Sequence, residues 1–167
     1  MKKLIITILF PSICFAQKNY DYKNLVLEGG GVRGLAYAGV FNVLEEKGIL
    51  QQIEKVGGSS AGSIAGMLVS IGYNAGEIDS LMMELPVQKF KDGYGGLVGK
   101  YKRLKTDFGI FKGDAFEKWI QQLVAHKTGK PGLTFEQLHK LHQKNSLYKD
   151  FYCTGTNLSK QQLEIFS

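Results

Sequence analysis

Cysteine, long apolar runs and concentrated basic charge are all scarce in this sequence. Of the 2 cysteines among 167 residues, Cys14 lies in an N-terminal segment that we expect to be removed, and Cys153 alone cannot form an internal disulfide. The apolar run from Leu4 to Phe10 is too short to span a bilayer. Basic residues concentrate only in the short run 100–105, so we expect no groove for nucleic acid.

Residues 1–16 resemble a secretory signal peptide. Two lysines precede the apolar run, and the small residues Cys14 and Ala16 stand at the positions that precede signal-peptide cleavage. We therefore predict cleavage after Ala16, a mature domain over residues 17–167, and export to the periplasm, the outer membrane or the medium. The alternative is a lipoprotein with Cys14 as the lipid acceptor, which the bulky Ile13 disfavours.

The composition is that of a globular protein of about one domain, with 44% hydrophobic and 22% charged residues. Loss of the N-terminal lysines would leave a mildly basic chain, which slightly favours an anionic membrane surface. Many of the 21 glycines cluster at positions 29–34, 57–66 and 93–99. These stretches are expected to be loops in which the backbone comes close to other groups.

Two stretches in succession pass from an apolar run through a glycine-rich turn into a helical pattern, which predicts an α/β fold with a parallel sheet and right-handed crossovers. The expected elements, in chain order, are a strand over 23–28, a helix over 35–47, a strand over 53–56, helices over 61–71, 75–85, 114–125 and 135–142, and strands over 151–156 and 162–166. A capping box at Thr134 supports the last helix.

Residues 87–112 show no clear period, and we expect an irregular surface excursion of the kind that covers or borders a site. Phe116 and Trp119 recur at helical spacing after it and are expected in the core.

Gly58, Ser59, Ser60, Ala61 and Gly62 form a G-x-S-x-G pattern between the second strand and its helix. A nucleophilic serine needs such a strained turn, because its hydroxyl must be exposed while glycines on either side let strand and helix approach each other. Ser60 is therefore the candidate nucleophile. The alternative is that Ser60 simply caps the helix in a glycine-rich turn.

The loop Gly29–Gly34 admits two interpretations. It contains G-x-G-x-x-G between a strand and a helix, which is typical of dinucleotide binding, but that site also needs an acidic residue at the end of the second strand. Glu54 lies near the start of that strand instead. The other interpretation is an oxyanion hole, in which the amides of Gly30 and Gly31 stabilise a developing negative charge. Both loops should then face one pocket at the carboxyl ends of neighbouring strands.

With Ser60 in its motif, the loop Gly-Gly-Gly-Val-Arg-Gly resembles that of the patatin-like phospholipases, and segments 111–114 and 133–138 are also similar to that family. The resemblance covers residues 22–167. It implies a three-layer α/β/α fold with a mainly parallel central sheet, and hydrolysis of acyl esters in lipids, as by a phospholipase A or lysophospholipase. It implies no cofactor or metal, a lipid or phospholipid substrate, and contact with a membrane surface.

The resemblance also assigns roles to residues. The implied roles are nucleophile for Ser60, nucleophile elbow for Gly58, Ser59, Ala61 and Gly62, and oxyanion hole for Gly29, Gly30, Gly31 and Gly34, with Arg33 supporting that loop.

The sequence departs from the family in one respect. The resemblance implies a catalytic dyad of serine and aspartate, in which an aspartate of an Asp-Gly-Gly or Asp-Gly-Ala turn activates the serine. Asp92-Gly93 is the one Asp-Gly pair here, and its position before the later strands indicates an ordinary loop turn. We therefore expect the catalytic aspartate to lie beyond residue 167, and the chain to be the N-terminal part of the domain.

Three further alternatives remain at this stage. A Ser-Asp-His triad would recruit His126, His139 or His142, although polar surroundings suggest surface positions for all three. Glu136 and His139 have the spacing of a metal-binding helix, but such sites need a second unit that the sequence lacks. A module that binds lipid without hydrolysing it is the alternative from another functional class.

Overall fold

The computed structural model describes residues 21–107 and 109–167. The signal-peptide prediction over residues 1–16, with its lipoprotein alternative at Cys14, therefore lies outside the described residues. The strands are β1 (Asn24–Leu27), β2 (Lys55–Gly58), β3 (Asp150–Asn157) and β4 (Gln162–Phe166). The helices are the 3-10 helix η1 (Gly31–Leu35) and the α-helices α1 (Ala36–Glu46), α2 (Ala61–Ser70), α3 (Ala75–Met83), α4 (Gly96–Thr106), α5 (Asp114–Thr128) and α6 (Phe135–His142).

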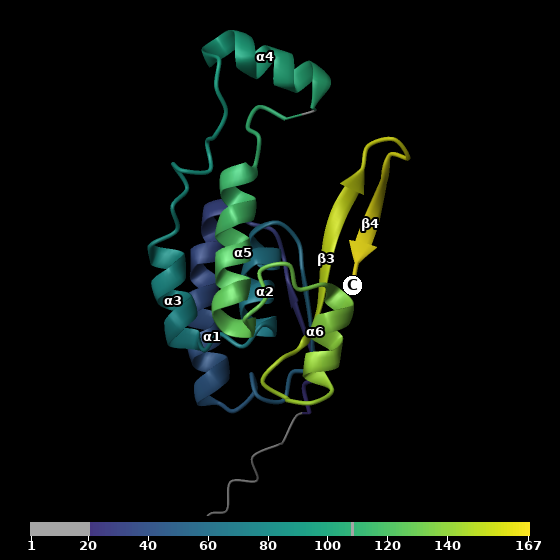
Figure 1. The fold of residues 1–167 in the computed structure, drawn as a ribbon. Helices are drawn as coiled ribbons and strands as arrows, with labels where there is room; N and C mark the ends of the chain where they lie inside the picture. Colours follow the sequence, from purple (N-terminus) through teal and green to yellow (C-terminus); the bar gives the residue numbers. More distant parts are fainter. Residues whose placement is uncertain (1–20, 108) are drawn as a thin grey trace, which may run out of the picture.

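The described strands form one sheet in the order β1-β2-β3-β4. β1, β2 and β3 are parallel, and β4 returns antiparallel to β3 as a hairpin. The prediction of a mainly parallel α/β sheet is confirmed. The strand arrows in Figure 1 place the carboxyl end of β3 at the end of the molecule from which α4 projects, and β1 and β2 run in the same direction.

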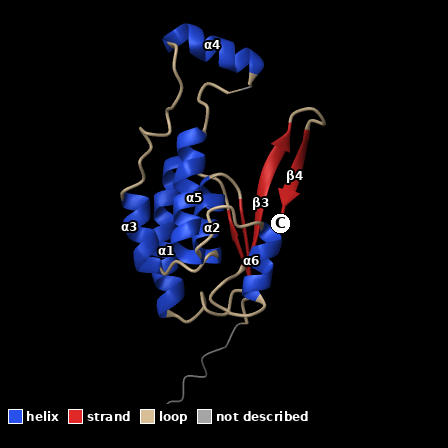
Figure 2. Cartoon of the chain, in the orientation of Figure 1, coloured by secondary structure: helices blue, strands red, loops and turns tan. Residues whose placement is uncertain are grey.

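The helices cover one face of this sheet (Figure 2). Leu25, Val56 and Phe151 are register partners in neighbouring strands and belong to the apolar core or pack against it. α2 lies close over them because Gly66 has no side chain, and a Cβ there would stand 3.0 Å from Val56. The opposite face carries Val26, which is 81% exposed. The described residues thus form two of the three expected layers, the sheet and one layer of helices.

Most expected elements are present, with some differences in their bounds. The second strand begins and ends two residues later than predicted, at Lys55 and Gly58, because Gly57 and Gly58 pair in register with β1 and β3. α5 continues to Thr128, where Gly129 adopts φ 73° and ends it. The expected irregular stretch 87–112 contains the helix α4, which the sequence pattern did not reveal.

Candidate active site

Ser60 lies on a strained turn between β2 and α2. Its backbone has φ 49° and ψ −123°, a conformation that side-chain-bearing residues rarely adopt, and its side chain is exposed. Such strain persists only where the surrounding structure imposes it, and it is commonly found at functional positions.

The capping alternative for Ser60 does not fit this geometry. Capping residues have extended backbone and accept a hydrogen bond from the first turn, as Asn74 does from Glu77 (2.9 Å) and Thr134 from Gln137 (3.2 Å). Ser60 has neither property. Its hydroxyl group makes no hydrogen bond within residues 21–107 and 109–167, so it is available to a ligand.

Two glycines allow the turn to be this tight. A Cβ on Gly58 would collide with the backbone of Gly62, and a Cβ on Gly62 would collide with the carbonyl oxygens of Leu27 and Glu28 at the end of β1. The first turn of α2 therefore rests directly on two strand ends. Replacing either glycine would move Ser60, because backbone atoms cannot swing aside as a flexible side chain can.

The glycine loop after β1 lies against this turn. A Cβ on Gly29 would stand 3.1 Å from the Ser60 Cβ, and one on Gly34 would stand 2.7 Å from the Ala61 Cβ. Residues of the two glycine motifs, far apart in the sequence, are therefore neighbours. Gly34 serves this close packing and is buried in the 3-10 helix η1, a helix that the sequence did not predict.

The amides at the start of η1 are free to bind an anion. The N–H groups of Gly30 and Gly31 precede the first intrahelical bond, and no acceptor for them is found among the described residues. Such amides carry the partial positive charge of the helix N-terminus. Arg33 contributes a backbone bond from its amide to the Gly30 oxygen (3.1 Å), while its guanidinium is exposed and makes no ion pair among the described residues. A role for its side chain stays a prediction.

A pocket of about 540 Å³ opens in front of Ser60. Its lining is mostly apolar and comes from η1, α2, α3, α5 and the stretch after α3; the residues are Gly31, Val32, Leu35, Ser60, Ala61, Ser63, Ile64, Met82, Leu85, Val87, Phe90 and Phe116. Val87 and Phe90 belong to the stretch that was expected to border a site. Phe116, predicted as core, forms part of this wall instead and packs on Phe90 with ring centroids 5.2 Å apart.

The sequence could not identify most of this wall. Met82 lies on α3, Leu85 lies just after that helix and Phe116 lies on α5, so their convergence depends on how α3 and α5 pack. The only available signal was weak, namely an apolar stripe from Ile78 to Met82 and Leu85, and these residues also belong to the core or pack against it.

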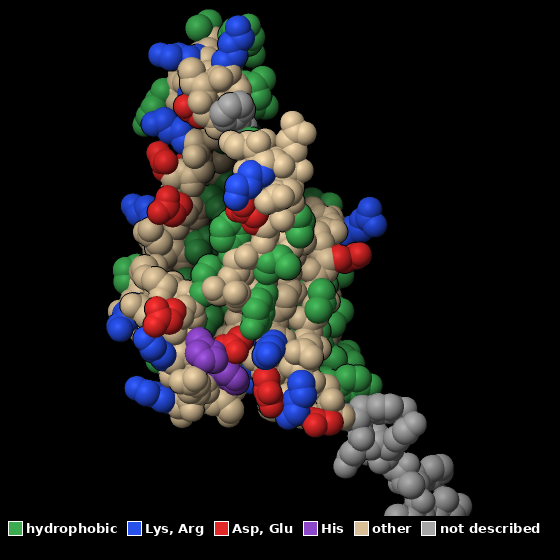
Figure 3. Space-filling view, turned by 90° about the vertical axis from the view of Figure 1, so that its right-hand side faces the viewer, with side chains coloured by type: hydrophobic (Ala, Val, Ile, Leu, Met, Phe, Trp, Pro, Cys, Tyr) green, Lys and Arg blue, Asp and Glu red, His purple; other side chains and the backbone are tan. Residues whose placement is uncertain are grey.

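The histidines lie away from Ser60. The His139 Nδ1 is 2.8 Å from an Asp150 carboxylate oxygen at the amino end of β3, opposite the end where Ser60 lies. His142 Nδ1 is 2.8 Å from the Tyr148 carbonyl oxygen, and His126 stacks on Tyr73. No described histidine lines the pocket in front of Ser60, so a Ser-Asp-His triad is not formed among these residues. In Figure 3 the visible histidine side chains lie near the end opposite α4.

Two other interpretations also lack support in the geometry. Glu136 forms an ion pair with Lys140 (2.6 Å), and the part of the chain that the structure describes holds no cluster of three potential metal ligands. Glu54 forms an ion pair with Lys23 (2.9 Å) at the amino end of β2, so it cannot hold a ribose at the carboxyl end. The dinucleotide interpretation therefore lacks its second contact.

Asp92 has a structural role. Its carboxylate accepts hydrogen bonds from the backbone amides of Lys112 (2.8 Å), Gly113 (3.0 Å) and Ala115 (2.9 Å) at the start of α5. These amides, that of Ala115 foremost, lower the pKa of the Asp92 carboxyl below its usual 3.8. A carboxylate occupied in this way is unsuited to accept a proton from Ser60.

The Asp92 contacts predict a pH-dependent contribution to stability. Because the folded pKa is lower than the unfolded one, the unfolded chain binds the proton first as the pH falls. The stabilisation is complete above the usual pKa of an aspartate and disappears as the pH falls through the folded pKa. We expect Asp92→Asn to lower the free energy of unfolding at neutral pH and to have a diminishing effect in acid. Urea denaturation across this pH range measures both quantities.

Asp79 supplies the control for this measurement. It is exposed on α3 and makes no hydrogen bond or ion pair among the described residues. The Asp79→Asn variant should follow the parent protein at every pH. A destabilisation by Asp92→Asn that is the same at neutral and acid pH would contradict the proposed contribution of the Asp92 carboxylate.

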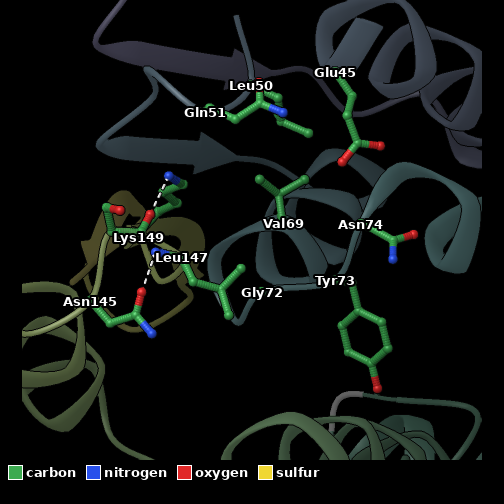
Figure 4. Close-up of a pocket in the computed structure, with 11 residues that line it drawn as sticks. Glu45, Leu50, Gln51, Val69, Gly72, Tyr73, Asn74, Asn145, Leu147 and Lys149 are labelled. Atoms are coloured by element: carbon green, nitrogen blue, oxygen red, sulfur yellow. Dashed lines mark hydrogen bonds between the residues drawn. The ribbon is translucent and has the colours of Figure 1, made fainter. Parts of the chain in front are cut away.

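A second pocket, of about 320 Å³, lies at a different place, between the α2–α3 turn and the segment before β3 (Figure 4). Its most unusual residue is Lys149, which is 6% exposed and donates a hydrogen bond to the Ser146 carbonyl oxygen (2.6 Å). Burial lowers the pKa of Lys149. The lining residues include no strained serine and no free helix-start amides of the kind found at Ser60, so this pocket is the weaker candidate for a reaction site.

The sequence is similar to a known protein family and to several known proteins. The sequence model of the family described as "Patatin-like phospholipase" matches residues 25–163. Uncharacterized protein YqhO of Bacillus subtilis is 40% identical over 114 residues, which is 64% of this chain and 37% of YqhO. Lysophospholipase NTE1 of Kluyveromyces lactis is 28% identical over 144 residues, which is 86% of this chain and 8% of that protein. The chain thus spans less than half the length of these relatives.

Solved structures show the same fold. The type III effector protein ExoU, from Pseudomonas aeruginosa, superposes with a TM-score of 0.65 at 21% identity, over 88% of this chain and 35% of ExoU. VipD from Legionella pneumophila superposes with a TM-score of 0.62 at 19% identity, over 89% of this chain and 39% of VipD. At these identities the likeness concerns the fold alone.

Proposed function

The chain belongs to the patatin-like phospholipase family, and from this premise we propose that it is the part of a lipid acyl hydrolase that supplies the nucleophile and the oxyanion hole. The observation that carries the proposal is the contact between the two glycine motifs. Gly29 lies against the Cβ of the strained, exposed Ser60, next to amides that have no acceptor among the described residues.

In this proposal the Ser60 hydroxyl oxygen attacks the carbonyl carbon of an acyl ester. The hydroxyl proton passes to a general base, and the carbonyl oxygen becomes an oxyanion beside the amides of Gly30 and Gly31. Collapse of this intermediate releases the alcohol part of the lipid, which takes the proton, and leaves the acyl group on Ser60. Water then hydrolyses the acyl-enzyme and releases the fatty acid.

We propose that the general base is an aspartate outside residues 1–167. Asp92, in the one Asp-Gly pair of the sequence, already accepts three backbone hydrogen bonds. A serine without a base is a poor nucleophile, so Ser60 needs a partner from elsewhere. The matched relatives are longer than this chain, which is consistent with a base in their additional portion.

The pocket in front of Ser60 suits an acyl chain. Its walls are built largely from aliphatic and aromatic side chains, including Leu35, Met82 and Phe90, with Ser60 exposed to it. Transfer of an acyl chain from water to such a surface is favourable by about 0.8 kcal/mol for each buried methylene. We therefore propose that the acyl part of the substrate, rather than its head group, occupies this pocket.

The experiment that tests the function is product analysis with a protein that includes the downstream aspartate. Incubation with phosphatidylcholine or lysophosphatidylcholine is expected to release free fatty acid, detected by mass spectrometry. Release of phosphocholine or phosphate without fatty acid would contradict acyl ester hydrolysis. Binding of the lipid with no product at all would favour the non-catalytic, lipid-binding alternative.

A further inference from the structure

The helix α4 projects from the body of the molecule (Figure 1). None of its residues is buried. We define the α4 arm as Tyr94–Asp107, which includes the helix and its flanking residues. An 11-residue helix that buries nothing gains little stability from packing, so its surface is expected to serve a contact with something else.

The helix α4 is amphipathic, and its charged residues are all basic. Leu97, Tyr101 and Leu104 are spaced i, i+4, i+7 and so share one face of the helix, and they are 84%, 62% and 52% exposed. Lys100 and Lys105 flank this face, and Lys105 lies over the Tyr101 ring at 5.2 Å. The helix contains no acidic residue. The lobe at the top of Figure 3 accordingly shows hydrophobic and basic side chains next to each other.

The orientation of this apolar face is fixed by bonds on another side of the helix. The Arg103 guanidinium donates hydrogen bonds to the carbonyl oxygens of Tyr94 (2.7 Å) and Ile110 (3.0 Å), which lie just before and after the helix. Before the arm, the Asp92 carboxylate accepts hydrogen bonds from backbone amides at the start of α5, which joins the two ends of the excursion. Because Arg103 lies on a different side of the helix from Leu97, Tyr101 and Leu104, these side chains remain presented to the outside.

The arm lies at the same end of the molecule as Ser60. Ser60 follows β2 at the carboxyl end of the parallel strands, and Figure 1 shows α4 beyond that end. The chain that leads to the arm also supplies Val87 and Phe90 to the wall of the Ser60 pocket. A surface that receives the arm would therefore lie near the entrance to the pocket.

We propose that the α4 arm docks on an anionic lipid bilayer. In this arrangement Leu97, Tyr101 and Leu104 enter the boundary between head groups and acyl chains, while Lys100 and Lys105 contact lipid phosphates. Lys102 lies on another side of the helix and adds to the positive charge within a Debye length of the surface. The helix lies in the surface, and no described helix is long and apolar enough to cross the bilayer. The inference rests on the proposed function, because a hydrolase of lipid esters must reach its substrate in a membrane.

Charge argues against a second copy of the chain as the occupant. Two arms that met through their apolar faces would bring lysines against lysines with no acidic residue of either helix between them. An anionic bilayer satisfies both the apolar face and the lysines. A nucleic acid would satisfy the lysines and leave the apolar face in water.

Vesicle co-sedimentation of the chain carrying Ser60→Ala tests docking without hydrolysis. We expect strong binding to vesicles of equimolar phosphatidylcholine and phosphatidylglycerol, and weak binding to phosphatidylcholine alone. Replacing Lys100, Lys102 and Lys105 with glutamate should lower the affinity for the anionic vesicles by about 100-fold or more, since each basic residue near the surface contributes roughly a factor of five. Replacing Leu97, Tyr101 and Leu104 with serine should weaken binding to both kinds of vesicle.

A triple variant with the same change in net charge is the matched control. Lys118, Lys130 and Lys144 are exposed, and their ammonium groups make no bond among the described residues. Their replacement with glutamate should lower the affinity much less than replacement of the arm lysines. Equal losses for the two triple variants would overturn the proposal, and so would a dimer in light scattering that the arm substitutions abolish.

Hydrolysis of a soluble short-chain ester separates this inference from the proposed function. With Ser60 and the base present, the arm variants should turn over the soluble ester like the parent protein while losing activity on anionic vesicles. Vesicle binding with no ester turnover would contradict the proposed function and leave the arm inference standing. Unchanged activity and unchanged binding on vesicles would overturn the arm inference alone.

Discussion

Replacing Ser60 with alanine is expected to lower the turnover of a short-chain acyl ester by about 10⁴-fold or more in a protein that includes the general base. The substitution removes the only atom that attacks the substrate in the proposed mechanism and leaves the oxyanion hole and the pocket in place. Ser60 makes no side-chain hydrogen bond among the described residues, so the variant should fold normally. Release of p-nitrophenol from an acyl ester measures the rate, and circular dichroism checks the fold.

Ser80→Ala provides the control for this substitution. Ser80 is exposed on α3, and its hydroxyl donates only to the carbonyl oxygen of Gly76 one turn earlier (3.1 Å). Its loss should leave turnover within about twofold of the parent, as for an ordinary surface position. If Ser60→Ala retained activity comparable to that of Ser80→Ala, Ser60 would not be the nucleophile.

The second large effect is expected for Gly62→Ala, which should lower the free energy of unfolding by about 3 kcal/mol. The added methyl group would meet the carbonyl oxygens of Leu27 and Glu28, both belonging to the backbone at the end of β1. To accommodate it, α2 would have to move away from the sheet, which would also loosen the packing of Gly66 on Val56. Urea denaturation followed by circular dichroism gives the change in free energy.

Gly39→Ala is the matched comparison, because it makes the same chemical change within another helix. Gly39 lies in α1 with no atom within 4 Å of an added Cβ. Alanine there should stabilise the protein by about 0.5–1 kcal/mol, since it restricts the unfolded chain and favours the helix. Equal effects of the two substitutions would show that α2 does not rest on the end of β1 as described.

The sequence predicted the arrangement around Ser60 because glycines mark the positions where segments of backbone approach each other closely. Gly58 and Gly62 flank Ser60 because side chains there would collide with backbone, and a Cβ on Gly34 would stand 2.7 Å from the Ala61 Cβ. Glycine in these positions has few explanations other than close packing, so its pattern was informative. Alternating strands and helices likewise predicted the parallel order of β1, β2 and β3.

Other features depend on contacts that sequence patterns do not contain. α4 was missed because Gly95, Gly96 and Gly99 interrupt its pattern and no side chain caps its start. β2 was placed two residues early because Gly57 and Gly58 are poor strand formers and extend only through pairing with both neighbours. The role of Asp92 depends on amides that follow it by 20 to 23 residues, a separation at which no local rule applies.

The measurement that tests the central claim most directly is a crystal structure of the protein after reaction with a fluorophosphonate. In the adduct the phosphonyl oxygen stands in for the oxyanion of the acyl ester reaction. We predict a covalent bond from Ser60 Oγ to phosphorus, with the phosphonyl oxygen within hydrogen-bonding distance of the Gly30 and Gly31 amides. Two results would contradict the account: phosphorus bonded to another residue, or a phosphonyl oxygen that points away from both amides while phosphorus is bonded to Ser60.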